Sequence, residues 1–307
     1  MSTALQVVDG VDLSGRTCVI TGASSGLGRE SARALAAAGA HVVLAARNRE
    51  SLAEARTWID NQVRGARTSA LVLDLTSLAS VRAAAAAICD EFPAIHVLMN
   101  NAGVMFTPFG RTSDGFEMHF GTNHLGHFEL TRLLMGRLIA ANGARVVILS
   151  SGGHLMGDVD FDDPNWETRE YDKFVAYGAS KTANILHMVE LDRRLRDCGV
   201  RAYAVHPGTV ATSLARHMTR DDFATLRSLA PRGTRASEPP DFRRDFLLPE
   251  QGAATQVWAS VSEQLADAGS VYLENCRISD AVAPYALDEA RAGRLWELSD
   301  RLCGGIA

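Results

Sequence analysis

The sequence has little lysine and little cysteine, and it has no long hydrophobic run. Lys173 and Lys181 are the only lysines among its 31 basic residues, so chemistry that needs an ammonium group has two candidates. The five cysteines are widely spaced, with no CxxC pair. This pattern argues against a disulfide framework or a zinc knuckle and fits a reducing compartment.

Neither sign of charge dominates the 307 residues. The 31 basic residues against 36 acidic ones give a net charge of -5, and 47% of residues are hydrophobic, which is ordinary for a soluble globular protein. These values exclude a disordered chain, a collagen-like chain and a nucleic-acid binder that works by bulk charge. The first fifteen residues do not resemble a signal peptide, and Ala83–Cys89 is far shorter than the ~20 apolar residues of a membrane span. We expect a cytoplasmic protein without a membrane span.

Short apolar runs alternate with helical stretches along the chain. The runs lack polar residues at alternate positions, which is typical of strands covered on both faces in a parallel sheet. The order predicts a single α/β domain with a doubly wound parallel sheet of about seven strands. The predicted strands are Thr17–Thr21, His41–Ala45, Ala70–Leu73, Val97–Met99, Val146–Leu149, Ala202–Val205 and Val271–Leu273. The predicted helices are Leu27–Ala38, Leu52–Val63, Ser77–Asp90 and about Lys173–Asp197.

Two irregular insertions interrupt this alternation. Gly152 to Glu170 is rich in aspartate, and Ser213 to Glu250 carries four prolines and many arginines. Both could be plain surface loops. Because both follow strands, and loops at the carboxyl ends of strands border the ligand crevice of such folds, we favour walls and a lid of a substrate site.

A glycine-rich loop follows the first predicted strand and opens the first helix. Thr21–Gly28 reads TGASSGLG, with glycines in GxxxGxG spacing. Glycines at such a turn let backbone N–H groups approach a pyrophosphate, and the helix N-terminus stabilises its negative charge. No lysine follows as in a P-loop, which disfavours a kinase or GTPase. The glycines could also be simple turn residues, so the loop alone leaves cofactor binding open.

The end of the second strand bears on the choice of cofactor. An acidic residue there would bind a free ribose 2′-hydroxyl, but this chain has Arg47, whose fork of donors suits a 2′-phosphate. NADP(H) is therefore favoured over NAD(H). Arg49 is a second candidate for the phosphate, and Arg47 could instead lie in solvent. NAD(H) stays possible if Glu50 or a backbone shift serves the ribose.

Polar residues also follow the third and fourth strands. Asp74 could accept the adenine amino group, or it could cap the helix that starts near Ser77. The segment Asn100–Gly103 reads NNAG, in which small residues leave room for a cofactor while an amide holds neighbouring strands.

Tyr177 and Lys181 stand four residues apart on a predicted helix and so share one face. A phenol with a pKa near 10 is a poor acid or base at neutral pH. A nearby ammonium group and a nicotinamide cation would favour the phenolate and bring its pKa toward the working range. An exposed tyrosine before a surface lysine is the alternative.

Ser150 and Ser151 end the fifth strand, where ligands meet such sheets. A hydroxyl group there could hydrogen-bond a substrate carbonyl, or it could cap a turn. No GxSxG motif surrounds the pair, which disfavours a serine hydrolase.

In combination, these motifs resemble those of the short-chain dehydrogenase/reductase family over nearly the whole chain. Thr21–Gly28 resembles its TGxxxGxG, Asn100–Gly103 its NNAG and Tyr177–Lys181 its YxxxK, and His206-Pro207-Gly208 resembles its PG motif. The resemblance implies a Rossmann-type fold and reversible hydride transfer between NADP(H) and a carbonyl or alcohol carbon.

The resemblance also implies roles for particular residues. Tyr177 is similar to the general acid/base and Lys181 to the residue that lowers its pKa and binds the nicotinamide ribose. Ser151 matches the serine that orients the substrate carbonyl, and Asn123 the asparagine that supports a proton-relay water. The implied cofactor contacts are Gly22, Ser24, Ser25, Gly26, Leu27, Gly28, Arg47, Asp74, Leu75, Asn101, Ala102, Gly103, Tyr177, Lys181, Pro207, Gly208, Val210 and Thr212.

Within the family, the chain resembles the group of retinol dehydrogenases and the WW-domain oxidoreductase. Asn123–Phe128, Tyr203–Val210 and the tail from Gly269 to Leu298 carry this resemblance. We expect no hydrophobic N-terminal segment of the kind that membrane-anchored members carry. Its gap of 26 positions between Ser151 and Tyr177 is longer than in compact members and suggests a reshaped pocket. We therefore expect a small apolar carbonyl or alcohol substrate and do not favour retinol itself.

Two rival functions remain. A non-catalytic NADP(H)-binding sensor or interaction protein of the same fold is disfavoured because the Tyr, Lys and Ser positions are intact. A metal enzyme is disfavoured because His124 and His127 have no third ligand at a recognisable spacing, so we predict no metal. We expect no nucleic-acid partner. A homo-oligomer, often formed in this family through the helix that carries Tyr177, is left open.

Overall fold

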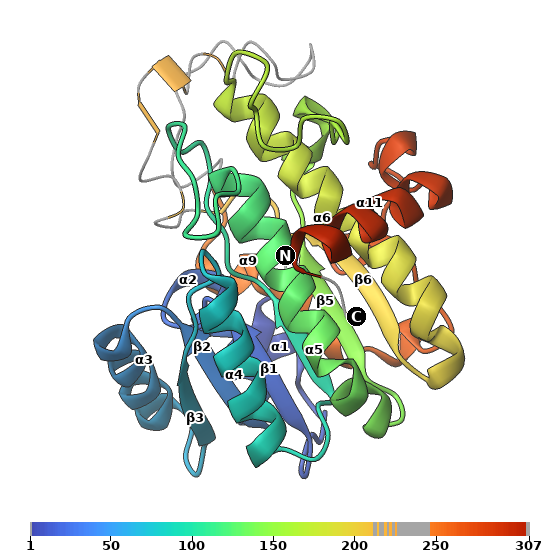
Figure 1. The fold of residues 1–307 in the computed structure, drawn as a ribbon. Coiled ribbons are helices and arrows are strands. Elements are labelled where there is room, and N and C mark those ends of the chain that lie inside the picture. The colour runs from blue at the N-terminus through green and yellow to red at the C-terminus, as the bar shows by residue number, and fades with distance from the viewer. Residues whose placement is uncertain are drawn as a thin grey trace.

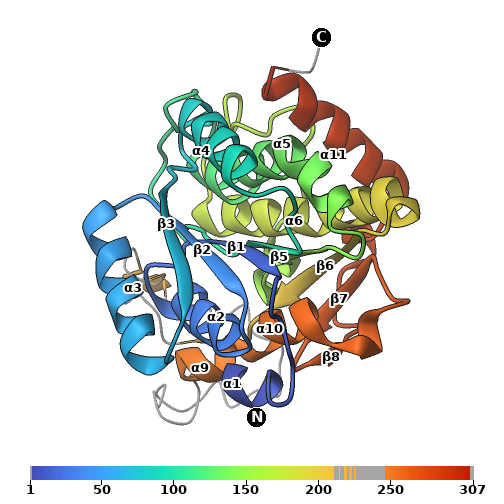
Figure 2. The same ribbon diagram turned by 90° about the horizontal axis from the view of Figure 1, so that it is seen from below.

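A single eight-stranded sheet organises the chain (Figures 1 and 2). The computed structural model describes residues 2–210, 214, 218–219, 221–222, 225 and 246–304. The strand order is β3-β2-β1-β4-β5-β6-β7-β8; only the pair β7–β8 is antiparallel among these. The strands are β1 (Thr17–Thr21), β2 (His41–Ala46), β3 (Arg67–Val72), β4 (Val97–Asn100), β5 (Arg145–Leu149), β6 (Arg201–His206), β7 (Val271–Glu274) and β8 (Arg277–Ile278).

The predicted doubly wound parallel sheet is confirmed, and two details are corrected. The sheet has eight strands rather than about seven, because β8 is a two-residue exposed strand too short to give a periodic signal. Strand β3 begins at Arg67, three residues before the predicted start at Ala70. As an edge strand, β3 leaves Arg67, Ala70 and Val72 exposed, so it does not read as a continuous apolar run.

Two layers of helices cover the two faces of the sheet (Figure 2). Each layer packs its own apolar core against the sheet. The first layer holds α4 (Leu78–Glu91), α5 (Gly126–Ala140), α6 (Lys173–Leu195) and α11 (Glu289–Leu302). The second holds α1 (Ala4–Val7), α2 (Gly26–Ala37), α3 (Arg49–Gln62), α9 (Pro249–Gly252) and α10 (Ala254–Val261). Short helical turns complete the described chain: η1 (Phe120–Leu125), η2 (Gly152–Met156), η3 (Arg196–Cys198), η5 (Glu263–Leu265) and η6 (Pro284–Ala286).

Helix α6 carries both Tyr177 and Lys181, and its ends are fixed by local chemistry. The Asp172 carboxylate caps its start by accepting hydrogen bonds from the N–H groups of Phe174 and Val175. The turn η3 continues it, and Gly199 ends it with a φ of 76°. Within the described residues, no helix combines the length and the apolar character needed to span a membrane.

Candidate active site

A cavity of about 700 Å³ opens at the carboxyl ends of the central strands. Thr21 of β1, Ala46 of β2, Leu149 of β5 and His206 of β6 are the last residues of their strands, and all line it. The cavity also gathers almost all of the predicted site residues. Asn123 lies buried behind the wall, and Thr212 lies outside the described residues. The predicted residues that line the cavity are Gly22, Ser24, Ser25, Gly26, Leu27, Gly28, Arg47, Asp74, Leu75, Asn101, Ala102, Gly103, Ser151, Tyr177, Lys181, Pro207, Gly208 and Val210.

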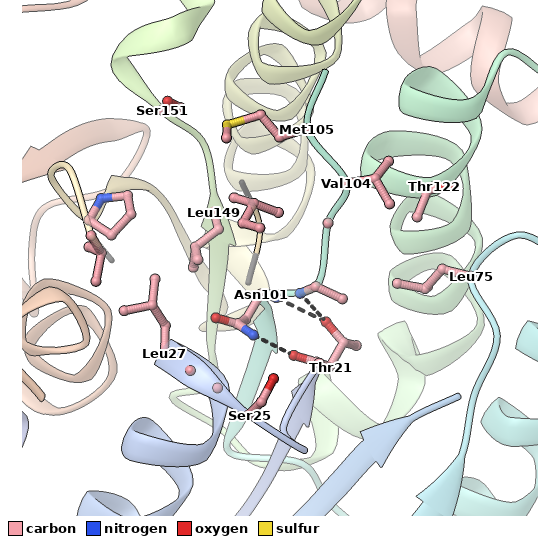
Figure 3. A pocket seen from close by; sticks show the side chains of 18 of the residues that line it. Thr21, Ser25, Leu27, Leu75, Asn101, Val104, Met105, Thr122, Leu149 and Ser151 are labelled. Atoms are coloured by element: carbon pink, nitrogen blue, oxygen red, sulfur yellow. Dashed lines mark hydrogen bonds between the residues drawn. The ribbon is translucent and has the colours of Figure 1, made fainter. Parts of the chain in front are cut away.

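The glycine loop forms one side of the cavity, and Ser25 and Leu27 lie opposite Ser151 and Met105 in Figure 3. Gly22 and Gly28 of this loop have no space for a side chain. A Cβ on Gly28 would lie 2.4 Å from the Gly22 carbonyl oxygen and 2.6 Å from Asn101 Nδ2. Ser25 precedes α2 without a capping side-chain hydrogen bond, which leaves the first N–H groups of α2 for another acceptor. These features fit a pyrophosphate.

Thr21 and Asn101 fasten this loop to the end of β4 (Figure 3). The Thr21 hydroxyl oxygen accepts from the N–H groups of Asn101 at 2.9 Å and Ala102 at 3.0 Å. Asn101 Nδ2 donates to the Thr21 carbonyl oxygen at 2.7 Å. The Asn-Asn-Ala-Gly segment thus joins neighbouring strands while its small residues border the cavity.

Arg47, Asn48, Ser51 and Asp74 also line the cavity, next to the ends of β2 and β3. Asn48 caps α3 by accepting from the Ser51 N–H at 2.6 Å. Arg49, the second phosphate candidate, is exposed and is not among the cavity residues.

Asp74 does not cap the following helix, because Ser77 does so. Instead, Asp74 Oδ1 accepts from the backbone N–H of Thr76 at 2.9 Å and from the Thr76 hydroxyl at 2.8 Å. Of the two roles left open for Asp74, this geometry removes the cap and leaves the adenine contact as a prediction.

Ser151 and Tyr177 both line the cavity. Ser151 Oγ accepts from the Gly153 N–H at 3.0 Å. The Tyr177 ring packs against Phe106, with 5.0 Å between ring centroids. A Cβ on Gly153 would lie 2.7 Å from Tyr177 Cε1, so a glycine at 153 lets the turn η2 lie directly on the phenol ring.

Burial dominates the proton affinities of the catalytic candidates. It raises the pKa of Tyr177 to about 12, and the Ser151 hydroxyl opposes this rise. Burial also lowers the pKa of Lys181 to about 8. Lys181 Nζ donates to the Leu149 carbonyl oxygen at 3.1 Å and lies 5.7 Å from the centroid of the Tyr177 ring. In the protein alone, desolvation thus outweighs the expected lowering of the Tyr177 pKa by lysine, and Tyr177 is a neutral phenol at pH 7.

Asn123 lies in the turn η1, where its side chain is fully engaged. Its amide nitrogen donates to the Val104 carbonyl oxygen at 3.0 Å and to Ser180 Oγ at 2.9 Å. Its Oδ1 accepts from the Val104 N–H at 2.8 Å. The side chain therefore joins the segment after β4 to helix α6, and the predicted part in a proton relay stays a prediction.

The histidines considered as metal ligands have other partners. His124 Nε2 lies 2.7 Å from Ser299 Oγ, and His127 Nε2 lies 2.8 Å from Thr21 Oγ1. Across the part of the chain that the structure describes, no three His, Cys, Asp or Glu side chains gather as metal ligands.

The motif search missed the apolar wall of the cavity. Apolar residues in loops carry no distinctive sequence signal, and only their position after the NNAG segment or within the insertions points to a pocket. It also missed His206, which lines the cavity with Nε2 4.0 Å from Glu274 Oε1. The wall includes Val104, Met105, Phe106, Met156, Leu214, Met218 and Phe246.

The two insertions contribute unequally to what is described. Gly153 and Met156 of the first insertion line the cavity, whereas Asp158 pairs with Arg291 of α11 at 2.6 Å. From the second, Leu214, Met218 and Phe246 line the cavity, and most of its remaining residues lie outside the described part.

Comparison with known proteins identifies the family of the chain. The short-chain dehydrogenase family model matches residues 16–222. Human retinol dehydrogenase 13 is 42% identical over 290 residues, covering 94% of this chain and 85% of that protein. Mouse retinol dehydrogenase 12 is 40% identical, covering 96% and 88%.

Solved structures show the same fold. The crystal structure of an uncharacterized protein from Mycobacterium paratuberculosis aligns with a TM-score of 0.76 at 34% identity, covering 97% of each chain. L-sorbose reductase from Gluconobacter frateurii, solved with NADPH and L-sorbose, aligns with a TM-score of 0.64 at 22% identity and covers 86% of this chain and 97% of that one. The fold, the motifs and the relatives together place the chain in the short-chain dehydrogenase/reductase family, as a retinol dehydrogenase-like oxidoreductase that acts on CH–OH or C=O groups.

Proposed function

We propose that the protein is an NADP(H)-dependent oxidoreductase that transfers a hydride between the nicotinamide and a carbonyl or alcohol carbon of a small apolar substrate. One observation carries this proposal: Ser151, Tyr177 and Lys181 line the same cavity as the glycine loop. A reacting carbonyl and a nucleotide cofactor can thus share one space.

The residues present fit the cofactor. The glycine loop and the start of α2 would hold the pyrophosphate, Tyr177 and Lys181 the nicotinamide ribose, and Arg47 the 2′-phosphate. Asn48 and Ser51, which line the cavity beside Arg47, offer further hydrogen bonds there. When bound, the cofactor supplies or accepts the hydride.

Tyr177 acts as the general acid when a carbonyl is reduced. With its pKa raised to about 12, it carries a proton at pH 7 that it can donate to the substrate oxygen. The Ser151 hydroxyl donates a second hydrogen bond to that oxygen as negative charge develops there. The Lys181 ammonium group stabilises the phenolate that remains, and Asn123 belongs to the route that returns a proton to it.

The cavity wall supports an apolar substrate. Met105, Met156 and Met218, with Phe106 and Phe246, line the same cavity as Ser151 and Tyr177. Unbranched methionine side chains adapt to substrates of varied shape. The names of the retinol dehydrogenase relatives also point to an apolar alcohol or aldehyde.

The test is NADPH consumption, with NADH in parallel, across aldehydes, ketosteroids, quinones, medium-chain ketones and retinal. We expect turnover with at least one apolar carbonyl, and we expect Tyr177→Phe to lose it by about 10³-fold while binding NADPH normally. A Tyr177→Phe enzyme at the wild-type rate would exclude the general-acid role. Tight NADPH binding without turnover on any compound would favour a non-catalytic sensor.

A further inference from the structure

His154 is a buried histidine three residues after Ser151, and the proposed mechanism does not use it. Its Nδ1 lies 2.7 Å from the Ser151 carbonyl oxygen, and its Nε2 accepts from the Ala283 N–H at 3.0 Å. A carbonyl oxygen can only accept and a backbone N–H can only donate, so the ring is neutral with its proton on Nδ1. Burial lowers the pKa of His154, which agrees with this state.

These contacts set the position of the turn that carries Ser151. The Ser151 carbonyl oxygen also accepts from the His154 backbone N–H at 3.1 Å, so one residue supplies two donors to it. On the other side of the turn, Gly153 donates to Ser151 Oγ and lies against the Tyr177 ring. A shift of this turn would move the Ser151 hydroxyl relative to the phenol.

Hydrogen bonds also join this turn to two distant parts of the chain. The His154 carbonyl oxygen accepts from Tyr285 Oη at 2.8 Å and from Thr182 Oγ1 at 3.2 Å. Thr182 follows Lys181 on α6, and Tyr285 lies in η6, next to Ala283. The imidazole links the Ser151 backbone directly to this C-terminal segment.

We infer that His154 is a positioning residue for Ser151. Its neutral ring holds the Ser151 backbone against the segment at Ala283 and so fixes the position of the Ser151 hydroxyl relative to Tyr177. The inference rests on the proposed function, because it assumes that Ser151 hydrogen-bonds the reacting oxygen. It predicts that losing the hydrogen bond of Nδ1 lowers turnover more than losing that of Nε2, because Nδ1 contacts the Ser151 backbone directly.

The test compares three substitutions at this position with one control. His154→Leu removes both ring hydrogen bonds and should lower kcat by about 10- to 100-fold while the Kd for NADPH stays within about twofold. His154→Asn keeps a donor near the place of Nδ1, whereas His154→Gln keeps an acceptor near the place of Nε2. We expect Asn to restore kcat more than Gln. Tyr285→Phe removes a bond to the same turn that does not reach the Ser151 backbone, so it should lower kcat less than His154→Leu does.

A double-mutant cycle with Ser151→Ala tests whether His154 acts through Ser151. If His154 acts through Ser151, His154→Leu should cause little further loss of kcat in the Ser151→Ala background. A full additional loss, or better rescue by Gln than by Asn, would overturn the inference. Thermal unfolding of each variant checks that the rates are those of folded protein. If wild-type turnover does not depend on Tyr177, the proposed function fails; if it does, but His154→Leu has the wild-type kcat, only this inference fails.

Discussion

The two ends of the cavity differ in the atoms that form them, backbone at one end and side chains at the other. The end that faces the proposed pyrophosphate is made mainly of backbone, with Gly22 and Gly28 packed against each other and against Asn101. The opposite end is made of the side chains of Ser151, Tyr177 and Lys181, and burial raises the pKa of Tyr177 and lowers the pKa of Lys181. The first end works by shape, and the second works by chemistry.

This difference determines which substitutions should harm each end. At the backbone end, an added methyl group should weaken cofactor binding although it changes no charge. At the side-chain end, removing a charge or a hydroxyl should lower kcat although the shape of the cavity is nearly kept. The four predictions below are ordered from the largest expected effect to the smallest.

Lys181→Ala removes the positive charge beside Tyr177 and the hydrogen bond to the Leu149 carbonyl oxygen. We expect kcat to fall by about 100- to 1000-fold, because the phenolate formed on proton donation loses its stabilising charge. Single-turnover rates with saturating NADPH measure this effect. Lys173→Ala is the matched control, since the only other lysine lies at the start of α6 and pairs with Asp222. Equal losses in both variants would contradict a local role for Lys181.

Gly28→Ala tests the shape of the opposite end. The added Cβ would lie 2.4 Å from the Gly22 carbonyl oxygen, and backbone cannot move aside cheaply. We expect the Kd for NADPH to rise by about 10- to 100-fold, corresponding to the ~1–3 kcal/mol typical of overpacking. Fluorescence titration with NADPH measures it. Gly136→Ala on α5 is the control, because no atom outside its own stretch of helix lies within 4 Å of the added Cβ, and affinity should be unchanged. An unchanged Kd in Gly28→Ala would show that the loop adapts.

Arg47→Ala tests the one charge proposed to act at the cofactor end. Because Arg47 is exposed, screening by water limits its contribution, and we expect the Kd for NADPH to rise only about tenfold. The Kd for NADH should stay within about twofold. Arg49→Ala, on a neighbouring exposed arginine that does not line the cavity, should change neither value. Equal weakening of NADPH and NADH would argue against the 2′-phosphate contact.

The backbone end could be predicted from the sequence because its chemistry is local. The glycine spacing and the residues after β1, β2 and β4 are contiguous motifs, and Gly22, Arg47 and Asn101 were found from them. The edge strands were predicted less well, since β3 is half-exposed and β8 has only two residues.

The side-chain end depends on long-range packing and was predicted only in part. Tyr177 and Lys181 share a helix face, but their burial and the resulting pKa shifts cannot be read from YGASK. The link from His154 to Ala283 spans 129 residues, and no local pattern indicates it. The apolar wall from Met105 to Phe246 is likewise assembled from loops that are distant in sequence.

The pH dependence of turnover is the mildest test of the difference between the two ends, because it removes one proton from Lys181 and changes no residue. Burial lowers the pKa of Lys181 from 10.5 to about 8, so Lys181 loses its charge as the pH rises through 8. If that charge supports turnover, kcat for carbonyl reduction should fall above this pH, by about fourfold at pH 8.5. The Kd for NADPH, measured over the same range, should change less, since the proposed pyrophosphate contacts are backbone N–H groups whose charge is independent of pH. Lys181→Arg keeps its charge throughout. Its rate should therefore be flat between pH 7 and pH 9, even if it is lower, and a fall that persists in this variant would assign the titration to another group.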